Sequence, residues 1–291
     1  MDNKTFFTIL IESVGPEQSF IQVFWVWSKH PGEGIEKVLR ACARMGIQNA
    51  LASEADVYDF DSLRDHIVFD EKLDVYLDET RHYFPTGNTF APPFGILKSC
   101  RDSELDYDLI REGFSRSKCE DGIYEVEAVI GKDKLFNTFI ELVKRLSSIK
   151  VFWLKIASDW EEKGREEFWT NDYLNTPERI TDYLTIHAND TILNGHVALT
   201  AYCGVGQTNL LVDTHKVIKI LTKSAKMQSK MVTGLKRLGF EETSELHSLE
   251  YGYYHWHFRP SRSKSRARLV AALKRDGFKA WHPNEQLSID S

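Results

Sequence analysis

The sequence predicts an α+β protein, built as tandem ferredoxin-like α/β sandwiches whose antiparallel or mixed sheets carry helices on one face. Segments rich in aromatic and β-branched residues alternate with segments whose apolar residues have helical spacing, in ββα and βαβ order. A helix-ending pattern also recurs, because residues 235–240 match residues 273–278 at five of six positions. One large mixed sheet is the alternative.

The beginning of the chain predicts two strands, a helix and a third strand. Residues 6–11 and 20–27 have the composition of strands, and a Gly-Pro turn lies between them. Residues 49–60 are expected to form the third strand. The helix before them is expected to end at Gly46, and its apolar residues have helical spacing: Ile35, Val38, Leu39, Ala43 and Met45.

Three further units of strand and helix are expected. The expected strands are residues 123–130, 151–156, 196–202, 209–221, 251–258 and 278–281, and the expected helices are residues 134–146, 224–238 and 263–276. Residues 159–191 are read as an insertion, with a helix that starts at the N-cap Thr176. A shift in composition near residues 115–122 predicts an N-terminal α+β domain, residues 1–118, and a C-terminal α+β domain with basic helices, residues 119–291.

Composition narrows the class of protein. Hydrophobic residues make up 42% of the chain and aromatic residues 12%, which predicts a folded core. No apolar run approaches the length of about 18 residues that a membrane span needs, so no membrane partner is expected. The four cysteines are scattered without a CxxC pair, which favours a reduced, cytoplasmic chain. No nucleotide or metal motif is present, so no cofactor is expected.

Charge is distributed unevenly along the chain. Residues 214–282 contain fifteen Lys or Arg and five Asp or Glu, so this segment carries +10 while the whole chain carries −6. The remainder therefore carries −16. Such a split indicates either a surface that faces a partner or two parts of the chain that face each other.

The most informative constellation is the expected strand at residues 251–258. Alternate residues of a strand share a face, so one face would carry a candidate binding surface of Tyr251, Tyr253, His255, His257 and Arg259. Two histidines at this spacing can share one metal ion if a third ligand is supplied, so His255 and His257 are the candidate ligands. Stacked tyrosines beside an arginine also suit bases or planar anions. A partly exposed sheet face without a ligand is the alternative.

The expected C-terminal helices carry basic stripes. If both helices lie on the same side of the sheet, the stripes would form one basic patch suited to phosphates: Lys226, Lys230, Arg237, Lys264, Arg268 and Arg275. Solvated helix faces are the alternative, and the pI near 6.0 argues against a dedicated nucleic-acid binder.

A third constellation joins Asp213 and His215, with Cys203 on the neighbouring strand. A cysteine, a histidine and an acid are the groups that nucleophilic catalysis uses. The alternative is a hairpin with one polar side and a buried cysteine. No local signature of a catalytic cysteine is present.

The sequence alone favours a non-catalytic intracellular binding or regulatory protein, which acts through a protein partner or through self-association. Nucleic-acid binding through the basic C-terminal third is one alternative. A metal-dependent enzyme centred on His255 and His257, with His215 as a further ligand, is the other.

Overall fold

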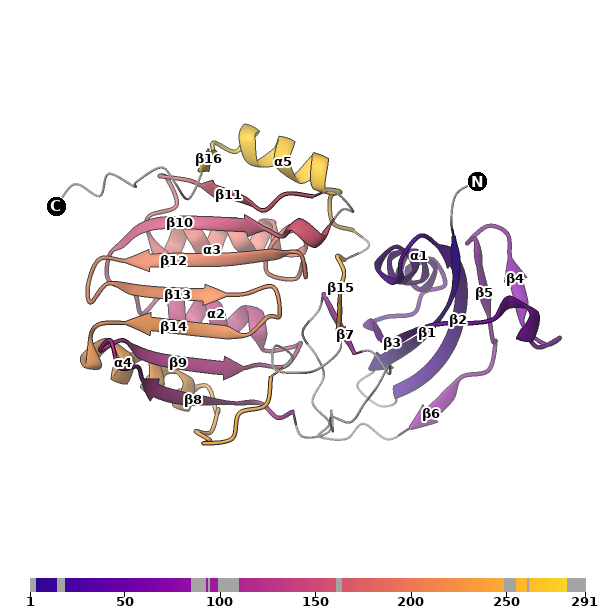
Figure 1. Ribbon diagram of the computed structural model, residues 1–291, viewed down its shortest axis with the longest axis horizontal. Coiled ribbons are helices and arrows are strands. Elements are labelled where there is room, and N and C mark those ends of the chain that lie inside the picture. The colour runs from indigo at the N-terminus through magenta and orange to yellow at the C-terminus, as the bar shows by residue number, and fades with distance from the viewer. Residues whose placement is uncertain are drawn as a thin grey trace.

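The computed structural model (Figure 1) describes residues 4–14, 19–84, 93, 95–98, 110–160, 164–248, 255–260 and 262–281. It confirms an α+β protein with antiparallel sheets. The chain forms an N-terminal unit within residues 5–84 and a C-terminal unit within residues 113–248 and 262–281. Two short strands lie between these units.

The N-terminal unit is a sheet covered by one helix. The strands run in the order β3-β1-β2-β5-β4, and β6 pairs with the beginning of β2. The elements are β1 (Thr5–Val14), β2 (Ser19–Ser28), α1 (Pro31–Arg44), β3 (Ala50–Val57), η1 (Phe60–Ser62), β4 (Val68–Asp70), β5 (Val75–Leu77) and β6 (His82–Phe84).

Helix α1 begins at Pro31, directly after the N-cap residue His30. The Nδ1 atom of the N-cap His30 accepts a hydrogen bond from the backbone N–H of Glu33 at 3.2 Å, and Pro31 follows at the first helical position. The apolar stripe of α1 then packs on one face of the sheet. Each fully buried aliphatic side chain there contributes about 1.5–3 kcal/mol. The sheet residues beneath the helix include Ile9, Ile11, Phe24 and Val26.

The C-terminal unit contains an eight-stranded antiparallel sheet in the order β16-β11-β10-β12-β13-β14-β9-β8. Its strands are β8 (Gly113–Lys118), β9 (Tyr124–Val129), β10 (Ile149–Ile156), β11 (Glu167–Thr170), β12 (Val197–Cys203), β13 (Thr208–Val212), β14 (Ile218–Thr222) and β16 (Lys279–Trp281). Every second residue of β13 and β14 is buried, as expected for a sheet with one covered face.

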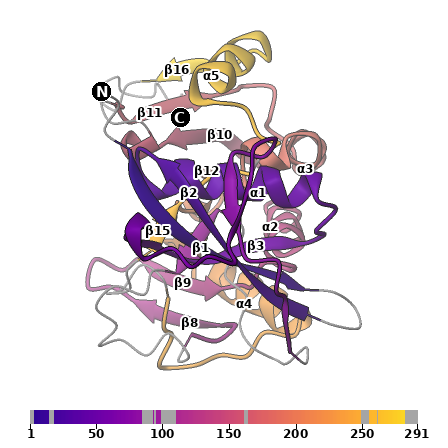
Figure 2. The same ribbon diagram turned by 90° about the vertical axis from the view of Figure 1, so that its right-hand side faces the viewer.

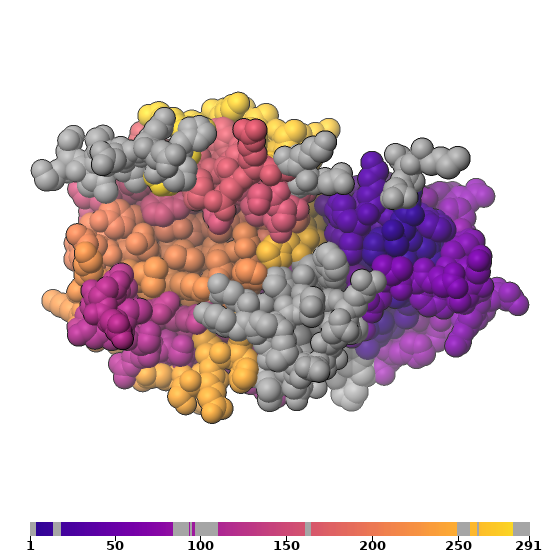
Figure 3. Space-filling view, in the orientation of Figure 1, coloured from indigo at the N-terminus to yellow at the C-terminus, as the bar shows by residue number. Residues whose placement is uncertain are grey.

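Helices cover one face of this sheet, on the side away from the viewer in Figure 1. They are α2 (Leu135–Val143), α3 (Pro177–Ile186) and α4 (Ala225–Arg237), while α5 (Arg266–Arg275) lies at the β16 edge. Phe139, Phe152 and Met231 are among the buried side chains between the helices and the sheet. The space-filling view shows the opposite face of the strands (Figure 3).

The two connecting strands are β7 (Ile96–Lys98) and β15 (His255–His257), which pair antiparallel. Figure 2 looks from the side of the N-terminal unit and shows its strands in front of the eight-stranded sheet. Phe258, which follows β15, is fully buried among core residues of the N-terminal unit. The C-terminal part of the chain therefore completes the N-terminal core.

The tandem ferredoxin-like arrangement is not confirmed. In a ferredoxin-like split βαβ unit, one strand lies between the two strands that the helix joins. Here α2 joins β9 to β10, and three strands lie between them: β12, β13 and β14. The described strands are also divided among separate sheets rather than gathered in one mixed sheet.

The expected helices and most of the expected strands are present, but strands β4 to β8 and strand β11, inside the expected insertion, were not expected. The positive φ angles of Gly46, Gly239 and Gly277, at 74°, 87° and 84°, confirm the predicted helix ends. The expected strand 209–221 is instead broken into β13 and β14. The break arises because the Oδ1 atom of Asp213 accepts a hydrogen bond from the backbone N–H of Val217 at 3.0 Å, which closes a turn.

No helix in the described part of the chain combines the length and the apolar character that crossing a membrane requires.

Candidate metal centre

Three segments that are far apart in the sequence meet at the end of the eight-stranded sheet that faces the N-terminal unit. Asp159 lies in η3 (Ser158–Trp160), directly after β10. His196 immediately precedes β12, and His257 is the last residue of β15. The antiparallel register pairs Ile156 with Val197, so the end of β10 lies beside the start of β12.

Backbone contacts hold His196 and His257 next to each other. The N–H of Gly195 donates to the carbonyl of Phe258 at 2.9 Å, and the N–H of Phe258 donates to the carbonyl of Gly95 at 2.8 Å. Gly95 and Gly195 approach so closely that a Cβ atom on Gly195 would lie 2.1 Å from the Gly95 oxygen. Only glycine fits at this crossing, because any side chain would separate the backbones.

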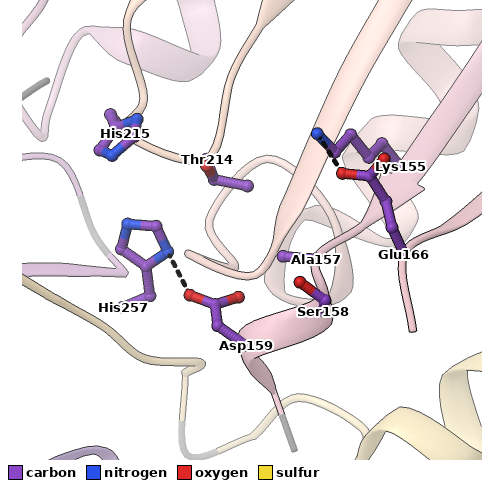
Figure 4. A pocket seen from close by; sticks show the side chains of 8 residues that line it. All are labelled: Lys155, Ala157, Ser158, Asp159, Glu166, Thr214, His215 and His257. Carbon is purple, nitrogen blue, oxygen red and sulfur yellow. Dashed lines mark ion pairs between the residues drawn. The ribbon is translucent and has the colours of Figure 1, made fainter. Parts of the chain in front are cut away.

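The donor atoms of the three residues converge on one point. The Nδ1 atom of His257 lies 3.3 Å from Oδ2 of Asp159, and the Nδ1 atom of His196 lies 3.8 Å from Oδ1. The three candidate ligand atoms all lie within 4.8 Å of one another. The Trp160 ring stacks on His196 at 5.2 Å and 8°, which fixes the plane of that imidazole. Figure 4 shows the carboxylate of Asp159 pointing at His257.

Burial and neighbouring side chains give His196 and Asp159 the protonation states that a metal ion requires. Burial lowers the pKa of His196, so its imidazole is neutral near pH 7. The neighbouring imidazoles of His196 and His257 hold the pKa of Asp159 far below its usual value. The carboxylate is therefore ionised, and its side chain is 57% exposed toward solvent. Metal ions bind neutral imidazole and ionised carboxylate.

Arg266 holds the segment that carries Asp159. This side chain is buried and comes from the first turn of α5. Its guanidinium donates to the carbonyls of Ala157 and Arg165, on either side of η3, and to Oε1 of Glu167 at 2.7 Å. A rigid planar donor thus connects both arms of the Asp159 loop.

The buried side chain of Lys216 anchors the turn between β13 and β14, which lies beside the site. Lys216 has a φ angle of 63°, and its Nζ atom donates to the carbonyl of Val197 at 2.7 Å. Burial lowers the pKa of Lys216 to about 7. The turn therefore stays attached to the start of β12, next to His196.

Two of the three ligands, Asp159 and His257, line a pocket of about 490 Å³. The His215 ring lies 5.1 Å from the His257 ring, and an ion pair of 2.5 Å joins Lys155 to Glu166 at the rim. Figure 4 shows Thr214 and His215 on one side of the space and Asp159 on the other. This volume is within the range of about 300–1,000 Å³ typical of small-molecule sites.

The predicted binding face 251–259 is only partly described. Tyr251 and Tyr253 lie outside the described residues, as does the side chain of His255, whose backbone belongs to β15. His257 is brought to the candidate centre. Arg259 instead pairs with Glu36 of α1, with 2.7 Å between Nη2 and Oε2.

The basic stripes on α4 and α5 lie at opposite ends of the sheet order. α4 packs near β9 and β14, whereas α5 lies by β16, so Lys226, Lys230 and Arg237 do not join Lys264, Arg268 and Arg275 in one patch (Figure 1). Lys264 pairs with Asp190, and Lys230 donates to the carbonyl of Arg145. Both helices pack into the same core cluster, but the two basic stripes are separated along the sheet order.

The charge split is partly explained within the chain. Basic residues of segment 214–282 pair with acidic residues outside it, in the pairs Lys219–Glu127, Arg259–Glu36, Lys264–Asp190, Arg266–Glu167 and Lys279–Asp172. Two parts of the chain thus face each other.

The Cys203, Asp213 and His215 constellation is not assembled. Cys203 ends β12 next to the 204–207 turn, whereas His215 lies in the turn at the other end of β13. The Asp213 carboxylate closes its own turn through Val217. The expectation failed because the antiparallel register pairs Cys203 with Thr208, so His215, seven residues further on, lies toward the other end of the hairpin.

Sequence reasoning missed Asp159 and His196. A signal was present, because Asp159 follows one expected strand and His196 opens another. Placing those two strands as antiparallel neighbours would have brought both residues to one edge. No short sequence motif could have indicated the site, because residues 159, 196 and 257 are far apart in the chain.

The N-terminal sheet also exposes an aromatic face. Strand alternation places Phe6 and Trp27 opposite the α1 side, and neighbouring rings lie 4.6–6.4 Å apart. The cluster contains Phe6, Trp25, Trp27, Tyr58, Phe60, Phe69 and Tyr76. Trp27, Phe60 and Phe69 are 38–44% exposed.

Comparisons with known proteins give no further information: no protein-family model, curated protein or solved structure matches this chain.

Proposed function

We propose that this protein binds one divalent transition-metal ion through Asp159, His196 and His257 and uses the ion in a metal-dependent reaction on a small substrate. The observation that carries the proposal is the convergence of three donor atoms, all within 4.8 Å of one another, at the edge of a pocket of about 490 Å³. The proposal keeps His257 from the sequence-based metal hypothesis and replaces the other ligands.

The donor set fits zinc well. Zinc holds nitrogen and oxygen ligands at about 2.0–2.2 Å, so tetrahedral ligand atoms lie about 3.3–3.6 Å apart. The separation of 3.3 Å between His257 Nδ1 and Asp159 Oδ2 matches this spacing, whereas the three ligand atoms together lie within 4.8 Å and would have to move closer around an ion. Two histidines and one carboxylate also bind iron(II) in many oxygenases, so both ions belong in the test.

The buried Nδ1 atom of His196 supports an ion at this point. It has no hydrogen-bond partner among the described groups, and its 3.8 Å separation from Asp159 exceeds hydrogen-bonding distance. A buried polar atom without a partner costs about 1–3 kcal/mol. Coordination to a metal would satisfy the atom and remove that cost.

Three protein ligands leave one coordination position for water. A zinc-bound water ionises near pH 7, which makes it a nucleophile for hydrolysis. His257 and Asp159 both line the pocket, so a substrate there would lie beside the ion. Hydrolysis is therefore the reaction class that we propose for a zinc-loaded protein.

The direct test is a titration of metal-free protein with Zn²⁺ and Co²⁺, followed by calorimetry and visible absorption. One ion should bind per chain, and His196→Ala should weaken binding at least 100-fold. His66→Ala is the matched control, because His66 also lies 3.5 Å from a carboxylate, that of Asp78, but on the surface. Metal binding that His196→Ala leaves intact would refute the site.

A second candidate function is protein binding through the aromatic face of the N-terminal unit. Residues 54–79 contain ten Asp or Glu and two Lys or Arg. Asp56 lies opposite Thr8 in the strand register, on the same side as the exposed rings. Aromatic rings beside carboxylates suit lysine and arginine side chains, so the partner would be a basic protein segment.

A synthetic peptide of alternating lysine and leucine is a suitable probe, and a glutamate–leucine peptide is its control. Fluorescence titration should show salt-sensitive binding that Trp27→Ser weakens. Equal binding of both peptides would contradict the proposal. Concentration-dependent sedimentation without peptide would point instead to self-association.

The remaining sequence-based proposals are less well supported. Nucleic-acid binding through the C-terminal third now depends on separate basic stripes rather than on one patch. A cytoplasmic location rests on the scattered cysteines.

A further inference from the structure

We infer that metal binding is coupled to the docking of the N-terminal unit, and that the ion pair between Glu36 and Arg259 positions the ligand His257. This inference rests on the proposed metal site. Two ligands, Asp159 and His196, belong to the C-terminal unit. The third ligand, His257, belongs to a segment that is anchored in the N-terminal unit.

Phe258 is the first anchor of that segment. It is fully buried in the core cluster that also contains Ile9, Phe24 and Val38. Because side chains of adjacent strand residues point to opposite sides, Phe258 enters the N-terminal core while His257 turns toward Asp159. A displacement of Phe258 from the core would therefore move His257.

The ion pair between Glu36 and Arg259 is the second anchor. Nη2 of Arg259 lies 2.7 Å from Oε2 of Glu36, and both side chains are largely buried. Nη1 of Arg259 donates to the carbonyl of Ser263 at 2.9 Å, so the guanidinium connects α1 to the chain that leads into α5. Removing one partner of a buried ion pair leaves the other charge buried and uncompensated, which strongly destabilises that contact.

Helix α1 also touches the ligand residue directly. A Cβ atom built on Gly32, in the first turn of α1, would lie 3.4 Å from the carbonyl oxygen of His257. The backbone that carries His257 thus lies between α1 on one side and Gly195 on the other. A shift of the N-terminal unit would change the spacing between His257 and the other two ligands.

Coupling follows from linkage. An ion that needs all three ligands binds the docked arrangement more tightly than an undocked one, so it shifts the population toward docking. By reciprocity, docking strengthens metal binding by the factor by which the ion strengthens docking, so a change that lowers the docked fraction lowers the apparent metal affinity. Glu36 would then influence the ion without touching it.

The experiment measures both directions of this linkage on the full-length protein. Co²⁺ affinity and the visible absorption of the bound ion are compared for the wild type, Glu36→Ala and Glu36→Gln. We expect about tenfold weaker Co²⁺ binding and an altered spectrum for Glu36→Ala, in the range of substitutions that reorient metal ligands. Glu36→Gln keeps a hydrogen-bond acceptor for Arg259 and should restore part of the affinity.

The matched control is Asp74→Ala. Asp74 pairs with Lys37, also on α1, at 2.9 Å, but Asp74 directly precedes β5, whereas β7, the partner of β15, contacts β3 at the other edge of the sheet. Its loss should leave Co²⁺ affinity unchanged. The reverse direction is hydrogen exchange: Zn²⁺ should slow exchange of α1 amides about tenfold in the wild type. His196→Ala, which changes only the C-terminal unit, should abolish that protection.

The outcomes separate the two proposals. If the wild type binds Co²⁺ but Glu36→Ala binds it equally and α1 shows no Zn²⁺-dependent protection, the coupling is refuted and the metal site stands. If the folded wild type binds neither ion, the metal site fails and the coupling fails with it.

Discussion

The two ends of the eight-stranded sheet are closed in different ways. At the end away from the N-terminal unit, the polar groups form hydrogen bonds within one continuous stretch of chain, through the hydroxyls of Thr208, Thr222 and Ser224. The Thr208 and Thr222 hydroxyls lie 2.7 Å apart, Thr222 donates to the carbonyl of Gly206, and Ser224 caps α4. At the other end, Asp159, His196 and His257 come from three separate segments.

This difference shows where chemistry can be placed on a sheet. The hairpin end is closed by hydroxyl–backbone bonds, which leave little for a ligand to satisfy. The end near the N-terminal unit leaves the Nδ1 atom of His196 and the Nδ2 atom of Asn194 buried without hydrogen-bond partners in the described structure. Groups of this kind are poised to bind an ion or a ligand.

Gly195→Ala should break this comparison most strongly. The new methyl group would lie 2.1 Å from the Gly95 carbonyl oxygen, so backbone must move. We expect a loss of at least about 4 kcal/mol of unfolding free energy, measured by urea denaturation. Gly122→Ala, in the β8–β9 turn at the hairpin end, has a φ angle of 82° and no atom of the described residues within 4 Å of the new methyl group, so it should lose less, about 1–2 kcal/mol. Equal losses would show that the two ends are not different in this way.

Lys216→Met should change how stability depends on pH. The folded-state pKa of Lys216 is about 7, below its value of about 10.4 in unfolded chains, so the unfolded state binds more protons between these values. The lysine therefore destabilises the fold at low pH, and the wild type gains stability as pH rises. Between pH 7 and 10 the wild type should gain up to about 4 kcal/mol relative to Lys216→Met. Parallel pH profiles of the two proteins would contradict this expectation.

Arg266→Met should loosen the loop that carries Asp159. Removing the buried guanidinium leaves Glu167 and two carbonyls without their donor, which should cost about 2–3 kcal/mol. Arg268→Met is the control, because Arg268 is exposed on the same helix and should change stability by less than about 0.5 kcal/mol. Thermal unfolding and Co²⁺ affinity would be measured on both. Wild-type Co²⁺ affinity in Arg266→Met would show that the loop does not need this anchor.

Thr222→Val should have the smallest effect and should act only at the hairpin end. The substitution keeps the shape of the side chain but removes the hydroxyl that contacts Thr208, Gly206 and Ser224. We expect a loss of about 1–2 kcal/mol, measured by urea denaturation. Metal affinity should not change, because the site lies at the other end of the strands. A drop in Co²⁺ affinity would mean that the two ends are coupled.

The hairpin end and the helix ends were predictable because their causes are local. A glycine after the last helical turn, as at Gly239 and Gly277, takes the left-handed conformation whatever surrounds it. Thr176 at the start of α3 accepts a hydrogen bond from the N–H of Arg179 at 3.3 Å, as its spacing before Pro177 predicts. The sheet order was not predictable, because it depends on pairing between distant segments: three strands separate β9 from β10, and no local sequence pattern indicates this.

The site was half predictable for the same reason. His257 was found from strand alternation, which is a property of neighbouring residues. Asp159 and His196 are isolated polar residues at strand ends, and only the pairing of β10 with β12 gives them a shared position. The turn at Asp213 was misjudged because its apolar neighbours favour a strand, while its carboxylate closes the chain on itself.

Phe258 has a consequence for how the chain is made. The core of the N-terminal unit, whose strands begin at Thr5, is complete only when a side chain about 250 positions later is in place. A ribosome must release that distant segment before the first sheet can finish packing. Folding during synthesis therefore cannot proceed strictly from the N-terminus, and a fragment that stops at residue 118 would leave the place of Phe258 open to water.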